Sequence, residues 1–238
     1  MAGLLGTIVN VAAVLVGGVI GLLFNKGVPE KIANALMIGV GFCTMYIGIS
    51  GCLDGENMLV AMLSIVFGAV VGTLLDIDAR LKQLGDFAER KLSKDENGKG
   101  TLAQGFVSAS LLFCVGTMAI VGSLQSGLEG NHETLYLKSV LDLISSIVFG
   151  ASLGAGVLLS TVTILVYQGG ITLLAQVIAP FLSDAVVAEM NCVGSLLIIG
   201  LSLNLLKVAK IKIANYVPAV FFPILLCPLY DWIQQLIK

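Results

Sequence analysis

Charged side chains are scarce in this chain of 238 residues, at 12% against about 25% in an ordinary soluble domain. Hydrophobic residues make up 57%, and the mean hydropathy is +1.00. A soluble fold of this size needs a charged surface, so the composition excludes an ordinary soluble protein. The sequence predicts an all-α membrane protein with several transmembrane helices.

Other scarcities exclude further classes of protein. The net charge of −2 comes with no basic stripe, which excludes a nucleic-acid-binding protein. One histidine and five scattered cysteines exclude a zinc or haem scaffold of the usual kind. The sequence has no HExxH or GxxxxGK[ST] string and no paired carboxylates within one apolar segment. We therefore expect no enzyme activity, no metal site and no cofactor.

Eight continuous apolar segments are long enough to cross about 30 Å of hydrocarbon. They cover residues 4–24, 33–53, 58–75, 102–124, 135–153, 157–182, 185–206 and 213–236. The first is expected to be a retained span and not a signal peptide. Residues 77–101 are polar and amphipathic, which predicts a cytoplasmic linker between the membrane helices of residues 1–76 and those of residues 102–238.

The distribution of basic residues predicts the orientation of these helices. Eleven of the thirteen lysines and arginines follow the first, third and seventh segments, and only Lys138 and Lys238 lie on the other side. By the positive-inside rule, the lysine-rich side is cytoplasmic. Both termini are therefore predicted to lie outside the plasma membrane.

A short string of the sequence occurs twice. Residues 64–72 read SIVFGAVVG and residues 146–154 read SIVFGASLG, with seven identities in nine positions. Each copy follows a similar apolar segment, which predicts an internal two-helix repeat, and many transporters hold their substrate between repeats. Three Gly-x-x-x-Gly spacings, at Gly17, Gly68 and Gly150, indicate close helix packing or dimerisation.

Asp142 is the only acidic residue that we expect well inside a span. An ionised side chain in hydrocarbon costs about 2.5–3.5 kcal/mol on insertion scales, so it needs a partner, a cavity or a function. Lys138 precedes it by one helical turn and offers a structural ion pair. The alternative is a carboxylate that couples solute movement to a cation or proton, with Ser145 one turn further along.

The sixth segment carries the string Tyr167-Gln168-Gly169-Gly170 near its centre. Two consecutive glycines there favour a broken helix, and broken helices near the midplane indicate a transporter's binding site. The alternatives are a packing notch and a bent junction between two shorter helices. With the transmembrane amide of Asn204, these four residues, Asp142 and Ser145 form the predicted substrate site.

Six strings of the sequence carry a resemblance to a known family. They are GTIVN (residues 6–10), LLDIDARL (74–81), SASLLFCVGTMAIVGSLQSGL (108–128), HETLYLKSVLD (132–142), YQGGITLLA (167–175) and GLSLNLL (200–206). Over nearly its whole length the chain resembles the YqgA/YdfK-like family of bacterial membrane proteins of unknown function. The resemblance implies a bacterial plasma-membrane location and a transport role.

These features predict a secondary transporter or facilitator of a small solute. The expected partners are the lipid bilayer and a small solute or ion, with no nucleic acid. One alternative is an ion or solute channel, formed by a homo-oligomer and gated at the glycine faces. The other is a non-transporting membrane partner or sensor that acts through the linker.

Overall fold

The computed structural model describes residues 2–25, 30–80, 83 and 101–237, and these residues are predominantly helical. The long N-terminal helices are α1 (Leu5–Asn25), α2 (Glu30–Cys52) and α3 (Met58–Leu74). They are followed by α5 (Thr101–Cys114), α6 (Thr117–Leu128), α7 (Glu133–Leu153), α8 (Gly156–Leu173), α9 (Ala175–Ile178), α10 (Asp184–Leu205) and α11 (Pro223–Ile237). The described residues also form the 3₁₀ helices η1 (Ala2–Leu4), η3 (Ala179–Phe181) and η4 (Ile213–Phe221). Most of the predicted linker lies outside the described residues.

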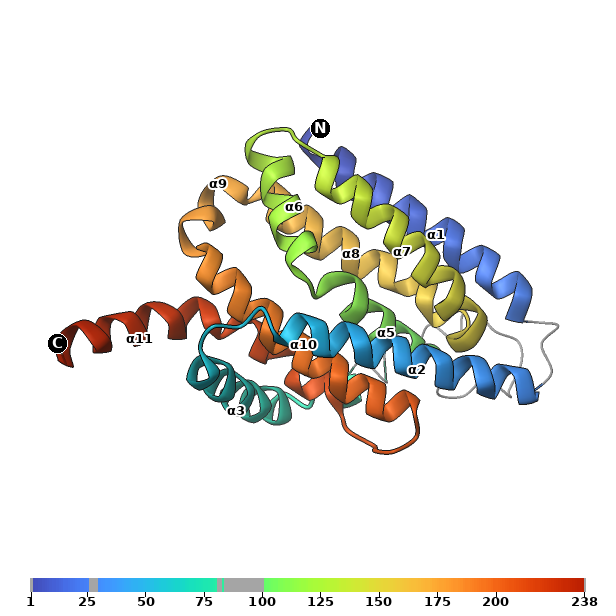
Figure 1. The fold of residues 1–238 in the computed structure, drawn as a ribbon. Coiled ribbons are helices and arrows are strands. Elements are labelled where there is room, and N and C mark those ends of the chain that lie inside the picture. The colour runs from blue at the N-terminus through green and yellow to red at the C-terminus, as the bar shows by residue number, and fades with distance from the viewer. Residues whose placement is uncertain (1, 26–29, 81–82, 84–100, 238) are drawn as a thin grey trace.

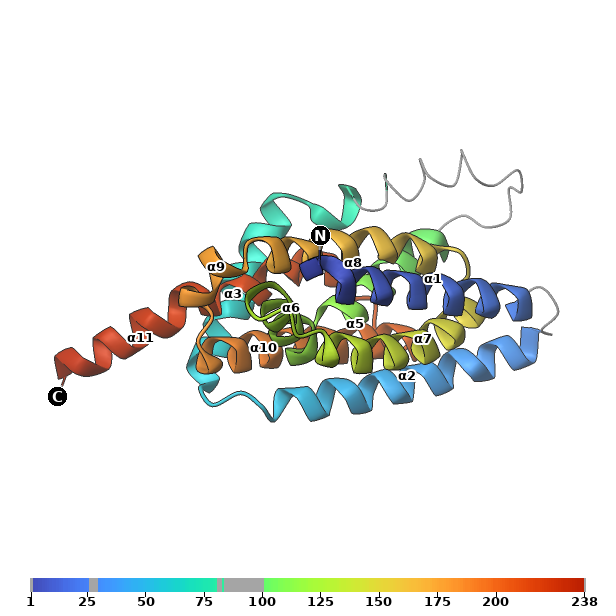
Figure 2. The ribbon, with the colours of Figure 1, turned by 90° about the horizontal axis from the view of Figure 1, so that it is seen from above.

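Two groups of helices lie side by side (Figure 1). In the first, α7 packs along α1, and α8 runs back between α1 and α5. In the second, α2 packs along α10, and α3 packs against η4. The C-terminal helix α11 projects away from both groups (Figure 2).

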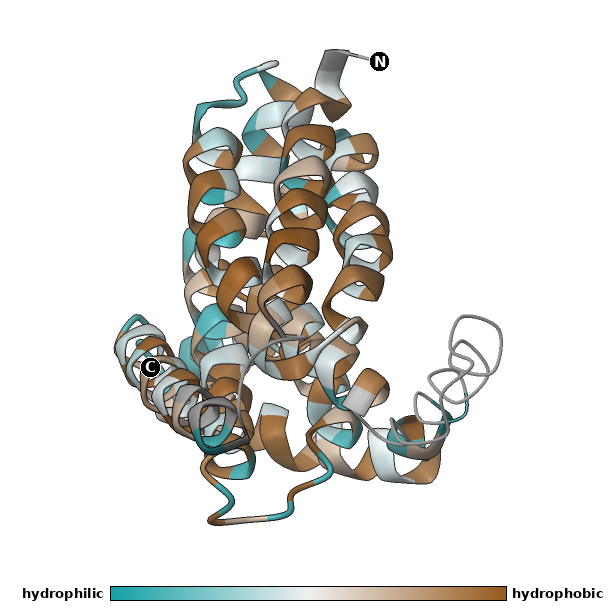
Figure 3. Cartoon of the chain, turned by 90° about the vertical axis from the view of Figure 1, so that its right-hand side faces the viewer, coloured by the Kyte–Doolittle hydropathy of each residue, from teal (hydrophilic) through white to brown (hydrophobic). Residues whose placement is uncertain are grey.

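The chain exposes apolar side chains and buries polar ones. Tyr46, Leu74 and Val166 are each at least 70% exposed, whereas Asn10 and Gln168 are fully buried. Figure 3 shows hydrophobic residues along the helices and hydrophilic ones gathered in the connecting loops. A hydrocarbon environment makes this distribution favourable, because lipid tails solvate apolar side chains and leave polar groups to find partners inside the protein. The predicted all-α membrane protein is confirmed.

The number of spans depends on how the bent and the shorter helices are counted. Among the described residues, α1, α7, α8 and α10 are long and apolar enough to cross a membrane, and two bent pairs raise the number to six if each pair is one span. Two shorter apolar helices, Ile38–Cys52 within α2 and Met58–Leu74 (α3), lie outside this number. The count of eight spans stays a prediction.

The helix predicted to break at Gly169-Gly170 is continuous there. α8 runs through both glycines to Leu173, and the carbonyl of Gly170 accepts a helical hydrogen bond from the N–H of Leu174 at 3.0 Å. Glycine lowers helix propensity by about 1 kcal/mol but keeps both backbone hydrogen-bonding groups, so tertiary packing can hold it in a helix. The prediction of a break at this position is wrong.

The fourth predicted span is broken instead. α5 and α6 meet at an angle of 60° around Gly116, whose φ of +140° favours glycine over any residue with a side chain. A second bend, of 49°, separates η4 from α11 at Pro223.

Glycines bring the backbones of packed helices close together. A Cβ atom on Gly17 would lie 2.4 Å from the carbonyl oxygen of Leu143, and one on Gly21 would lie 2.3 Å from that of Ile147. On α3, a Cβ on Gly72 would lie 1.8 Å from the carbonyl oxygen of Asn215. These glycine faces are therefore occupied inside one chain, by α7 for α1 and by η4 for α3. The internal repeat stays a prediction.

Candidate functional site

A buried ion pair lies within α7. The Nζ atom of Lys138 pairs with Oδ2 of Asp142 four residues later, and the two residues are 5% and 7% exposed. The spacing places both side chains on one face of the helix. The structural pairing expected from the sequence is thus present.

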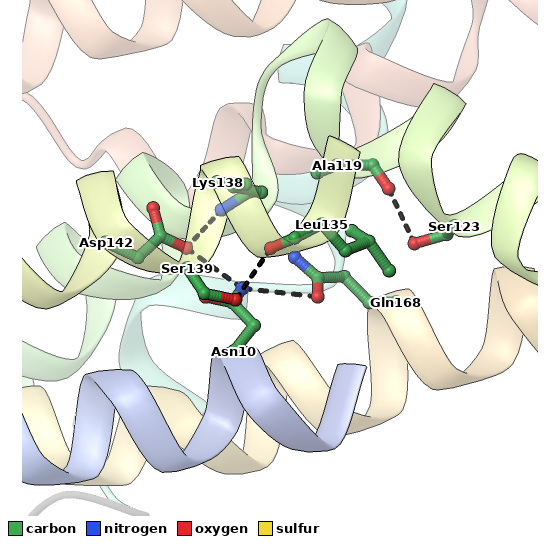
Figure 4. Close-up of polar contacts among 8 residues, drawn as sticks. All are labelled: Asn10, Ala119, Ser123, Leu135, Lys138, Ser139, Asp142 and Gln168. Carbon is green, nitrogen blue, oxygen red and sulfur yellow. Dashed lines mark hydrogen bonds and ion pairs between the residues drawn. The ribbon is translucent and has the colours of Figure 1, made fainter. Parts of the chain in front are cut away.

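Two amide side chains from other helices extend this ion pair into a network (Figure 4). Nδ2 of Asn10, on α1, donates to Oδ2 of Asp142 at 3.0 Å and to Oε1 of Gln168, on α8, at 3.2 Å. Asn10 thereby joins the carboxylate to the glutamine. Helices α1, α7 and α8 each contribute to one polar cluster inside an apolar bundle.

Asn10 and Gln168 each keep one amide atom without a partner. Nε2 of Gln168 and Oδ1 of Asn10 are buried and make no hydrogen bond within the described chain. Turning the Gln168 amide over would bring its Nε2 against Nδ2 of Asn10, two donors in contact. The network therefore fixes the orientation of the amide and leaves a donor and an acceptor free.

The unpaired atoms continue along α1 and α8. The hydroxyls of Thr7 and Thr172 are also buried and unpaired in the described residues. Thr7 precedes Asn10 by three residues, about 4.5 Å along the helix, and Thr172 follows Gln168 by four. Because α1 and α8 run in opposite directions (Figure 1), both hydroxyls lie on the same side of the cluster, toward the start of α1 and the end of α8. We call Thr7, Asn10, Gln168 and Thr172 the polar seam.

Clustering distinguishes the seam from other unpaired polar atoms. Elsewhere in the described part of the chain, four further buried side chains have such an atom, one each on α3, α5, α7 and α10: Ser64, Ser108, Ser152 and Glu189. α1 and α8, by contrast, carry two each within about one helical turn. Most buried polar groups in proteins have a partner, so four that face one helix interface require an explanation.

Both ends of the seam are closed. Near the N-terminus, Oγ of Ser126 on α6 donates to the carbonyl of Gly3 at 2.5 Å and lies 2.7 Å from Nδ1 of His132. A Cβ on Gly3 would lie 3.7 Å from the Thr172 methyl group. The contact between Ser126 and Gly3 therefore lies over the Thr172 end of the seam. At the other end, Val14 and Val157 are fully buried in an apolar cluster that includes Phe149.

Tyr167 and Gly170 face away from the seam into an apolar groove of about 790 Å³. Its walls come from α6, α8, α9, η3, α10, η4 and α11, and include Ile120, Met190 and Phe221. Residues 167 and 168 point to different sides because successive residues on a helix are about 100° apart. Gly169 is buried near Leu4, so the four-residue string does not form one binding surface.

Ser145 and Asn204 do not join the network. Ser145 lies one turn beyond Asp142 and is half-buried, and no hydrogen bond links it to the cluster in the described structure. The Asn204 amide donates to the carbonyl of Ile211 at 2.7 Å and accepts from its N–H at 2.8 Å. Both polar ends of Asn204 thus hold the loop after α10, and the structure does not bring Asn204 to the cluster.

Sequence reasoning missed one buried acid. Glu189, on α10, is 2% exposed, and its Oε1 accepts from the backbone N–H groups of Glu56 and Asn57 at 2.7 and 2.6 Å. It therefore holds the connection between α2 and α3 at the start of α3. Glu189 is the fifth residue of the seventh predicted apolar segment, so the sequence itself indicated an acid there. The expectation that Asp142 is the only acidic residue well inside a span is therefore wrong. No group of three or more metal-ligating side chains occurs among the described residues.

Comparison with known proteins places the chain in a family. A family model described as a protein of unknown function, DUF554, matches residues 5–228. The chain belongs to the DUF554 family. The "Uncharacterized membrane protein YdfK" of Bacillus subtilis (strain 168) is 29% identical to this DUF554 protein over 222 residues, 92% of this chain and 93% of YdfK. The "Uncharacterized protein YqgA" of Escherichia coli (strain K12) is 26% identical over 217 residues, 90% of this chain and 92% of YqgA.

The expected resemblance to the YqgA/YdfK-like family is thereby confirmed, as is a membrane location. No solved structure matches this DUF554 protein.

Proposed function

We propose that this DUF554 protein is a secondary transporter or facilitator that moves a small polar solute across the bacterial plasma membrane, with no enzymatic chemistry. One observation carries the proposal: four unpaired, buried polar atoms lie on the two packed helices α1 and α8, beside a buried ion pair. Ionisable groups inside membrane helices are rare and mark substrate or ion paths. A solute or water between α1 and α8 would provide the missing hydrogen-bond partners.

The proposed site differs from the one predicted from the sequence. Gln168 and Asp142 remain, Asn10, Thr7 and Thr172 join them, and Tyr167, Gly170 and Asn204 leave. Lys138 and Asp142 neutralise each other, and the carboxylate orients Asn10, which in turn orients Gln168. The ion pair is thus a positioning element of the solute site.

Access to the seam would be controlled by α6. This helix begins just after the bend at Gly116, and its last turn contacts Gly3 through Ser126. A Cβ on Gly127 would also lie 2.3 Å from the carbonyl oxygen of Thr172. Rotation of α6 about Gly116 would therefore uncover Thr7 and Thr172 while the apolar cluster at Val14 stays closed. With both termini outside, as the basic residues predict, this gate faces the cell exterior.

The channel alternative has less support. It required glycine faces free to pack between copies of the chain, but Gly17, Gly21 and Gly72 each contact another helix of the same chain. A homo-oligomer would need a different surface. The partner or sensor alternative depends on the linker, most of which lies outside the described residues.

Thiol labelling tests the proposed site without knowledge of the solute. In a background without the five native cysteines, Thr172→Cys places a thiol in the seam. Leu165→Cys, on the same helix, places one on an exposed apolar surface outside the groove. We expect a membrane-impermeant maleimide to label the first in liposomes and not the second, because only the seam opens to water. If the maleimide labels neither cysteine, the proposal is contradicted.

The α6 gate is tested in the same assay. Ser126→Ala removes the contact with Gly3, whereas the matched control Ser123→Ala removes a bond within α6 itself, to the carbonyl of Ala119. We expect Ser126→Ala alone to raise the labelling rate at position 172. An equal rise in both variants would argue against a gate at this contact.

A further inference from the structure

We infer that the solute of the polar seam is a small uncharged molecule with both hydrogen-bond donors and acceptors, such as a polyol or a simple amide. The inference rests on the proposed function and adds the chemical class of the solute. It follows from the charge of the cluster and from the kinds of atom left unpaired.

The fixed charges of the cluster cancel. Lys138 and Asp142 form a direct ion pair, and Asn10 donates its amide hydrogens to Oδ2 of Asp142 and to Gln168. No other ionisable side chain is bonded to this cluster within the described residues. An ion entering the seam would therefore lose its hydration shell without meeting an uncompensated charge, which is unfavourable at membrane depth.

The free atoms are of mixed kind. Nε2 of Gln168 is a donor, Oδ1 of Asn10 is an acceptor, and the hydroxyls of Thr7 and Thr172 can each act as either. A bare cation would be attracted by the oxygens and repelled by the Gln168 amide hydrogens. An anion would be repelled by the Asn10 oxygen, and the paired Lys138 offers it no uncompensated positive charge. A hydroxyl or amide compound presents both kinds of group and can satisfy all four atoms.

The apolar groove at Tyr167 is a poor alternative site for such a solute. Among its lining residues only Thr163 and Tyr167 carry polar side-chain atoms, and the Thr163 hydroxyl already accepts from Ser110 at 3.0 Å. A polyol in this groove would leave most of its hydroxyls without partners. The observations therefore favour the seam on the opposite side of α8.

Stopped-flow light scattering with proteoliposomes of the full chain tests the inference. Glycerol and urea are the uncharged probes, and sodium, potassium and acetate ions are the charged ones, followed with a voltage-sensitive dye. The variant Gln168→Leu removes the free donor while keeping the side chain's approximate size. Leu165→Ile, at an exposed position of the same helix that does not line the groove, is the matched control.

We expect the wild-type protein and Leu165→Ile to accelerate the entry of an uncharged probe. Loss of the Gln168 hydrogen bond should reduce this flux about tenfold or more. Size-exclusion profiles like that of the wild type would show that the variant is folded. Ion flux that depends on Gln168, without flux of either uncharged probe, would overturn the solute class and leave the transport function standing. If no probe shows a flux that depends on Gln168, both the solute class and the transport function are overturned.

Discussion

At the scale of single residues, Asp142 belongs at once to an ion pair within α7 and to a hydrogen-bond network across three helices. The sequence could predict the first part, because a four-residue spacing brings Lys138 and Asp142 together on any helix. It could not predict the second, because Asn10 and Gln168 are 158 residues apart and meet only through the packing of α1 against α8. Sequence spacing carries no information about such a meeting.

The same reasoning applies to Asn204, which the structure does not bring to the cluster. Its transmembrane position suggested an amide facing solute, but the chain turns back after α10 and brings Ile211 within reach of both amide atoms. The reversal includes Lys207, whose φ is +60°. A sequence pattern does not show which neighbour satisfies a buried amide.

Breaking the Lys138–Asp142 pair tests the network at this scale. Asp142→Asn leaves the Lys138 charge buried and unpaired, and we expect it to cost roughly 3–5 kcal/mol of stability. Lys138→Met should cost a similar amount, and combining the two should cost less than the sum because neither charge then remains. Thermal unfolding in detergent measures all three variants. Additive losses would contradict a direct pairing.

At the scale of helices, the hydropathy of the sequence located the apolar segments well but could not locate their bends. A Gly-Gly pair suggested a break in the sixth segment, yet α8 is continuous there, while the single Gly116 marks a bend of 60° between α5 and α6. Glycine permits a bend, a close helix contact or an unbroken helix. Which of these occurs depends on the neighbouring helices.

Two glycine substitutions separate these roles. A Cβ on Gly170 meets no atom within 4 Å, so Gly170→Ala should leave stability unchanged or raise it by up to about 1 kcal/mol through helix propensity. A Cβ on Gly21 would overlap α7, so Gly21→Ala should destabilise by roughly 1–3 kcal/mol. Thermal unfolding in detergent compares them. A marked loss of stability in Gly170→Ala would restore the idea of a break in α8.

At the scale of the whole molecule, composition alone predicted a helical membrane protein, because 12% charged residues cannot cover a soluble surface. Composition could not predict how α1, α7 and α8 are arranged around the polar seam. It depends on glycine contacts such as Gly17 against Leu143, which set how closely the helices approach. In the described structure, Ser126 bonds to Gly3 at one end of the seam, and Val14 lies in an apolar cluster at the other end.

The most direct test of the central claim is a high-resolution density map of the purified protein in lipid nanodiscs with glycerol present. We predict ordered non-protein density between α1 and α8, within hydrogen-bonding distance of Nε2 of Gln168 and Oδ1 of Asn10. The Lys138–Asp142 pair should remain intact beside it. A seam without such density, in which the Gln168 and Asn10 amides find protein partners instead, would contradict a solute site at this position.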